Sequence, residues 1–183
     1  MIIKMSDDKI QLILVVESEK SAKTDSQYIR KLIMKLFDKT ISDKDIKLSD
    51  VFMCGKSNYN KKSTIKQIND WKKYNAKGIN YIIYFFDTDN VSDPTWIKKL
   101  NDEVIHFCSA NKYEFVWFSY DIEDVFLQKQ IEDKKKLSEA SKYKIDDYFK
   151  KISPFIYDQN STNQYFEHHS NIMLVLNQIF NSL

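Results

Sequence analysis

Two nearly continuous apolar runs constrain this chain more than any other feature: residues 10–16, Ile-Gln-Leu-Ile-Leu-Val-Val, and residues 80–86, Asn-Tyr-Ile-Ile-Tyr-Phe-Phe. Such runs are typical of strands that a parallel sheet buries on both faces. Two shorter segments, 46–54 and 114–118, predict further strands. Segments with helical spacing of apolar residues separate the strands, which indicates βαβ crossovers. We therefore predict an α/β fold with a Rossmann-like sheet of about four parallel strands flanked by helices.

The chain of 183 residues, 43% of them hydrophobic, predicts a single domain over residues 1–183. The α/β core is expected over about 10–130, and a helical C-terminal extension over about 131–183. The last helix, expected at about 162–182, carries one apolar face. That face would cover the sheet or meet a partner, so a homodimer stays open.

Composition excludes some classes of protein and leaves others open. The formal net charge of +2 is too small to predict nucleic-acid binding by itself. Cys54 and Cys108 are too few and too far apart for a disulfide framework or a zinc motif, which indicates a reduced, cytoplasmic protein. No apolar segment predicts a signal peptide or a membrane span, so no membrane partner is expected.

Acidic clusters follow three of the predicted strands, at residues 17–19, 87–89 and 121–124. Because the carboxyl ends of parallel strands meet at one edge of a sheet, the three clusters belong together. Asp87 and Asp89 would point the same way in extended backbone. Gathered carboxylates repel one another unless a hard divalent cation offsets their charge. The alternative is that each cluster only caps a helix or keeps a loop solvated.

The motifs resemble those of TOPRIM domains. Residues 12–30, LILVVESEKSAKTDSQYIR, are similar to the opening strand and helix of that family, in which a Glu ends the first strand. YFFDTDN at 84–90 resembles the family's Asp-x-Asp motif. FSYDIEDVFL at 118–127 resembles a later motif, with Glu123 at the matching position.

The wording of the first motif is closest to the defence-associated branches, among them RloB-like, AriB-like and OLD-type proteins. In these branches a Gly often stands where this chain has Ser18, and this chain carries two extra residues before Thr24. The order of the motif is otherwise kept by Glu17, Glu19, Lys20, Thr24, Asp25 and Tyr28.

The resemblance implies a Mg²⁺-dependent or Mn²⁺-dependent nuclease that hydrolyses DNA or RNA in prokaryotic anti-phage defence. It implies that Glu17, Asp87 and Asp89 hold the metal. Glu123 and Asp124 would complete a second metal site or orient water. Lys20 would offset phosphate charge, so the expected catalytic residues are Glu17, Lys20, Asp87, Asp89 and Glu123. The resemblance also leaves an ATPase partner open, because many members of the family are fused to an ATPase or act with one. This chain has no Walker-type phosphate-binding motif, so it is not expected to hydrolyse ATP by that route.

Two other functions fit the same residues. The fold would also serve as a non-catalytic TOPRIM-like binding or regulatory module that acts with a partner protein. A different phosphoryl-transfer enzyme is the third interpretation, since residues 87–89 resemble a phosphatase nucleophile pair, which normally follows the first strand. A base-stacking platform around Tyr59 or Tyr120 is a further hypothesis.

Overall fold

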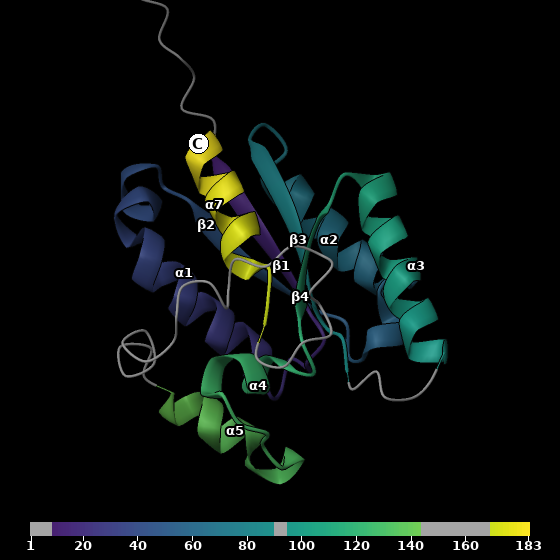
Figure 1. Ribbon diagram of the computed structural model, residues 1–183. Coiled ribbons are helices and arrows are strands. Elements are labelled where there is room, and N and C mark those ends of the chain that lie inside the picture. Colours follow the sequence, from purple (N-terminus) through teal and green to yellow (C-terminus); the bar gives the residue numbers. More distant parts are fainter. Residues whose placement is uncertain (1–8, 90–94, 144–168) are drawn as a thin grey trace, which may run out of the picture.

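The computed structural model describes residues 9–89, 95–143 and 169–183. Its centre is a four-stranded sheet in the order β2-β1-β3-β4, with all neighbouring strands parallel (Figure 1). The predicted α/β fold with four parallel strands is confirmed. The strands are β1 (Ile10–Val16), β2 (Lys47–Phe52), β3 (Ile79–Asp87) and β4 (Glu114–Phe118).

Helices occupy the connections between the strands and the region after β4. A helix covers the end of the chain, as predicted, although residues 162–168 of that prediction lie outside the described residues. The helices are α1 (Thr24–Asp43), α2 (Lys62–Tyr74), α3 (Thr95–Asn111), α4 (Ile122–Leu127), α5 (Asp133–Lys142) and α7 (Ile172–Ser182).

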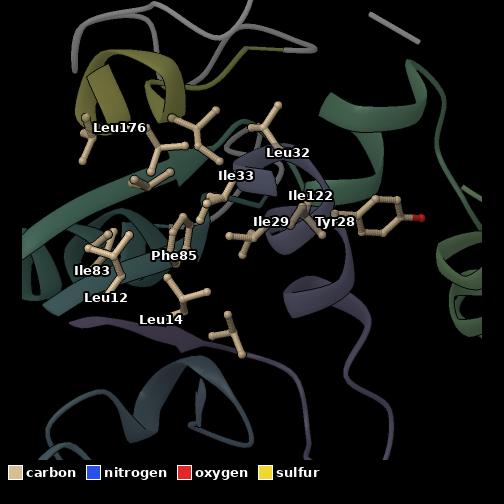
Figure 2. Packing of buried hydrophobic residues seen from close by; sticks show 14 of the residues in the cluster. Leu12, Leu14, Tyr28, Ile29, Leu32, Ile33, Ile83, Phe85, Ile122 and Leu176 are labelled. Atoms are coloured by element: carbon tan, nitrogen blue, oxygen red, sulfur yellow. The ribbon is translucent and has the colours of Figure 1, made fainter. Parts of the chain in front are cut away.

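The sheet has a separate apolar core on each face because successive side chains of a strand point to opposite sides. Leu12 and Leu14 of β1 belong to the core shared with α1, α4 and α7. Figure 2 shows Leu12, Leu14 and Phe85 facing Ile29 of α1, with Leu176 of α7 nearby. Ile13 and Val15 of β1 belong to the second core, on the face of the sheet that α2 and α3 cover (Figure 1). This double burial explains why β1 reads as a continuous apolar run.

The connections place a topological switch point between β1 and β3. From β1 the chain passes through α1 to β2 on one side, whereas from β3 it passes through α3 to β4 on the other. In sheets of this kind ligands bind outside the carboxyl ends of the strands at the switch point. Glu17 follows β1 directly and Asp87 ends β3, so both lie at this position.

The C-terminal segment closes the free edge of the sheet at β4. Asn171 Oδ1 accepts a hydrogen bond from the Trp117 backbone N–H (2.9 Å), and Asn171 Nδ2 donates to the Phe115 carbonyl (3.0 Å). The apolar face of α7 is buried against the core of the same chain. That face therefore covers the sheet of its own chain. It gives no support to a homodimer, which stays a prediction.

Trp96 and Tyr59 lie in surroundings that differ from those considered from the sequence. The spacing of Trp96 with Leu100 and Val104 predicts that Trp96 lies on the apolar face of α3, but Trp96 is 61% exposed. Tyr59 is not an open stacking platform, because its ring is buried and packs edge-on against Phe107. Among the described residues, no helix is both long enough and apolar enough to cross a membrane.

Candidate functional site

The centre of the candidate site is a direct contact between the ends of β1 and β3. The backbone N–H of Asp87 donates a hydrogen bond to Glu17 Oε1 at 2.8 Å. The bond can form because β1 and β3 are neighbours in the sheet and both strands stop at this level. This bond, and the electrostatic effect of Glu17 on the Asp87 side chain, show that two residues 70 positions apart in the sequence lie at one site.

Both carboxyl groups hold their protons more tightly than usual. Burial raises the pKa of Glu17 to about 8, although the Lys56 ammonium and the Asp87 hydrogen bond act in the opposite direction. Burial also raises the pKa of Asp87 well above its ordinary value, and the negative charge of Glu17 adds to this effect. A site that strips water from two neighbouring carboxylates is one where a cation would bind favourably.

Asp89 joins the site through a different geometry from the one expected. Its backbone has a positive φ of 56°, so the extended alternation ends before it. Its carboxylate Oδ2 lies 2.6 Å from Lys56 Nζ, and the same ammonium donates to the Asp87 carbonyl oxygen. Asp89 therefore contributes charge near Glu17, but a lysine holds its carboxylate.

The third acidic cluster lies on α4, next to the same edge of the sheet. Asp121 caps α4 by accepting a hydrogen bond from the Asp124 backbone N–H at 2.7 Å. Glu123 is 2% exposed, and its Oε2 lies 3.3 Å from Lys136 Nζ of α5. Burial raises the pKa of Glu123 to about 7 despite this lysine. Asp124 is buried at the same first turn.

The charges of these residues act on one another across the site. Asp121 and Glu123 both help to raise the pKa of Asp87, and Lys136 is stabilised in its charged form by Glu123 and Asp121. Lys136 also lies 3.2 Å from Asp121 Oδ2, which ties α5 to the site. The clusters after β1, β3 and β4 therefore form one electrostatic unit.

Lys20 lies outside this unit. It is exposed on the loop between β1 and α1, where it lines a groove of about 340 Å³ along the outer edge of β2. Lys23 and Arg30 line the same groove, and Arg30 is paired with Asp50 at 3.0 Å. The structure therefore places Lys20 in a groove that Asp50 also lines and that includes none of the acidic residues after β1, β3 and β4.

Three charged residues of the site were not expected from sequence. Asp25 accepts a hydrogen bond from the Ser18 backbone N–H (2.9 Å), and its charge helps to raise the pKa of Glu17 and of Asp87. Sequence offered one signal for Asp25, its place in the first motif. Lys56 and Lys136 carried none, because only the tertiary fold brings the loop after β2 and helix α5 to the acids.

A divalent cation fits the chemistry of this site. Six carboxyl groups belong to the electrostatic unit, and the ammonium groups of Lys56 and Lys136 form ion pairs with three of them. The hydroxyl oxygen of Ser18, next to Glu17, is buried and has no hydrogen-bond partner in the structure, so it is available to a water or a ligand. The carboxyl groups are those of Glu17, Asp25, Asp87, Asp89, Asp121 and Glu123.

No group of three or more metal-ligating side chains lies in a metal-binding arrangement in residues 9–89, 95–143 and 169–183. Lysines bind three of the carboxylates, because Lys56 contacts Asp89 and Lys136 contacts both Asp121 and Glu123. Among the described residues, no third carboxylate joins Glu17 and Asp87 to form a set of metal ligands. The residues supply hard oxygen ligands of the right kind, and Asp89 would have to leave Lys56 to complete a set.

The fold and the site together define an α/β protein with a doubly wound parallel sheet and an acidic centre at its switch point. Comparison of the chain with protein-family models, curated proteins and solved structures found no match.

Proposed function

We propose that this chain is a Mg²⁺-dependent or Mn²⁺-dependent nuclease of the TOPRIM type that hydrolyses nucleic-acid phosphodiesters in prokaryotic anti-phage defence. The observation that carries the proposal is the 2.8 Å bond between the Asp87 backbone N–H and Glu17 Oε1, which joins residues of two motifs at the switch point. The sequence resemblance to the defence-associated TOPRIM branches supplies the reaction and the setting, including a cytoplasmic location.

Glu17 and Asp87 would hold the cation, with Asp89 as the third ligand. Bound there, the ion would polarise a phosphoryl oxygen and lower the pKa of an attacking water. Glu123 would accept a proton at its carboxylate, because burial already brings its pKa to about 7, near the working pH. Asp124 lies on the same turn and would support a second cation or orient water.

A nucleic acid is the proposed substrate because two lysines and an arginine line a groove next to the first motif in the chain. Lys20 and Lys23 stand on the loop that leaves Glu17, and the groove continues along the edge of β2 past Arg30. The lysines would attract the phosphate groups of a nucleic acid in this groove. One of these phosphate groups would reach the acidic centre. An ATPase partner is compatible with this arrangement and would act through another surface.

The proposal is tested by a cleavage assay with single-stranded, duplex and transfer-RNA substrates in Mg²⁺, Mn²⁺ or EDTA. Glu17→Gln and Asp87→Asn keep side-chain size and remove charge, so each should lower cleavage at least a hundredfold. Asp102→Asn, an exposed carboxylate on α3, is the matched control and should cleave like the wild type.

Absence of cation-dependent cleavage in the wild type on every substrate would contradict the nuclease proposal. Phosphate trapped on Asp87 after incubation with acetyl phosphate would indicate phosphoryl transfer to the protein instead. That result would favour the interpretation as another phosphoryl-transfer enzyme.

A second candidate is a non-catalytic binding module. It is favoured by the two lysines, because Lys56 and Lys136 already stabilise Asp89 and Glu123 without any metal. Such a module would bind nucleic acid equally well in EDTA and Mg²⁺, and Asp87→Asn would bind like the wild type. A nuclease should show cation-dependent binding that this substitution removes.

A further inference from the structure

Lys56 reaches the acidic centre from a loop that is built to hold it. Gly55 adopts φ +111°, a conformation that side chains disfavour, and its N–H donates to the Glu17 carbonyl at 2.9 Å. Asn58 Nδ2 donates to the carbonyls of Met53 (2.9 Å) and Cys54 (2.8 Å), which closes the turn. The loop after β2 is thereby fixed to the end of β1.

The Lys56 side chain is much less exposed than that of its ion-pair partner, Asp89. The side chain is only 11% exposed and crosses the face of the Phe86 ring, with Nζ 5.0 Å from the ring centroid. Its partner Asp89 is 47% exposed on the outer side. The ammonium is therefore fixed inside the site, and its carboxylate partner is the member of the pair that is free to turn toward solvent.

We propose that Lys56 is the phosphate-binding residue of the site, held by Asp89 until a divalent cation takes that carboxylate. The inference rests on the proposed function, because it assumes that the acidic centre binds a cation and a phosphodiester. When Asp89 turns to the cation, Lys56 remains nearly buried and loses its main partner. The ammonium then keeps its hydrogen bond to the Asp87 carbonyl oxygen but has no ion pair with Asp89, and a nearly buried charge without its ion pair is unfavourable. An anionic phosphoryl oxygen would restore the pairing.

The proposal predicts effects of opposite sign for one substitution. Lys56→Met keeps the length of the stem over Phe86 and removes the ammonium that competes for Asp89. Affinity for Mn²⁺ should therefore rise about tenfold, since one opposing charge is gone from the site. Affinity for a phosphodiester in the presence of Mn²⁺ should fall about tenfold, since a charge-assisted hydrogen bond is lost.

The experiment measures both affinities on the intact chain. Mn²⁺ binding is followed by electron paramagnetic resonance of the free ion. Phosphodiester binding is followed by fluorescence anisotropy of labelled phosphorothioate oligothymidylate and oligouridylate, which resist cleavage. Lys61→Met removes the same charge from an exposed position on the same loop, and it should change neither Mn²⁺ affinity nor phosphodiester affinity by more than about twofold. Lys56→Arg should retain most of the phosphodiester affinity and is the second variant if Lys56→Met folds poorly.

Weaker Mn²⁺ binding by Lys56→Met would show that Lys56 only positions Asp89, and the proposal would be overturned. Unchanged affinities for both ligands would overturn it as well, as would a wild type that binds no Mn²⁺. A wild type that binds Mn²⁺ and oligonucleotide but cleaves nothing would remove the nuclease function alone. In that case the two binding constants still decide the role of Lys56.

Discussion

The backbone N–H of Asp87 points at the carboxylate of Glu17, 2.8 Å from Oε1, so the end of β3 is fixed directly to the first residue after β1. One consequence is electrostatic, because the same contact holds two carboxyl groups in surroundings that disfavour their charge. Another is structural, because the bond sets the relative position of two motifs at the topological switch point of the sheet.

The stability of the metal-free protein should fall as the pH rises. Folded protein keeps the proton on Glu17 up to about pH 8, whereas the ordinary pKa of this group is 4.5. Between these values the folded state binds more protons than the unfolded chain, so the free energy of unfolding decreases with pH. Glu123, with a pKa of about 7, acts in the same direction.

Urea denaturation in EDTA at pH 5.5 and pH 8 measures this effect. Glu17→Gln resembles the protonated side chain, so its stability should depend less on pH than that of the wild type. Equal pH dependence of the variant and the wild type would show that Glu17 titrates normally in the folded protein.

Lys136 should stabilise the fold by pairing with Glu123. Lys136→Met leaves a 2% exposed carboxylate without its cation, and unfolding free energy should drop by about 2–3 kcal/mol at pH 8. The loss should shrink at pH 5.5, where Glu123 is protonated. Denaturant titration at both pH values checks the prediction. Lys134→Met, in an exposed pair with Glu132, should cost less than about 0.5 kcal/mol.

The groove beside β2 should carry most of the nucleic-acid affinity. Replacing Lys20 and Lys23 together with Ala should weaken binding of a labelled oligonucleotide about tenfold and reduce its salt dependence. The measurement is fluorescence anisotropy at several salt concentrations. Lys72 and Lys73 are exposed on α2, so their double Ala variant removes the same charge elsewhere. Equal losses in both variants would indicate attraction without a defined groove.

Asn171 should be a strong determinant of stability although its two hydrogen-bond partners on β4 are not predicted site residues. Asn171→Ala leaves the Trp117 N–H and the Phe115 carbonyl of β4 without their partners, which should cost roughly 2–4 kcal/mol. Asn111→Ala removes an exposed bond to the Phe107 carbonyl and should cost much less. Thermal unfolding of both variants tests this, and a similar small shift in each would show that β4 does not need the Asn171 clamp.

The sequence by itself determined the strands, their parallel arrangement and the edge at which the acidic clusters gather. Apolar runs such as residues 10–16 are readable because burial on both faces leaves no polar alternation. Glu17 was identifiable because it directly follows β1, and Asp87 because it ends β3. Neighbouring parallel strands end at the same edge of a sheet, so both residues were expected there. The helical end of the chain was predicted as well, from its spacing of apolar residues.

Only the tertiary structure decided which charges meet. Lys56 and Lys136 lie on a loop and a helix whose sequences contain nothing that predicts a contact with Asp89 or Glu123. The left-handed backbone of Asp89 likewise has no signature in the sequence. Periodic patterns report which face of an element is buried. The pairing of polar side chains depends on how distant loops fold over the sheet, and that is fixed by the sum of many long-range contacts.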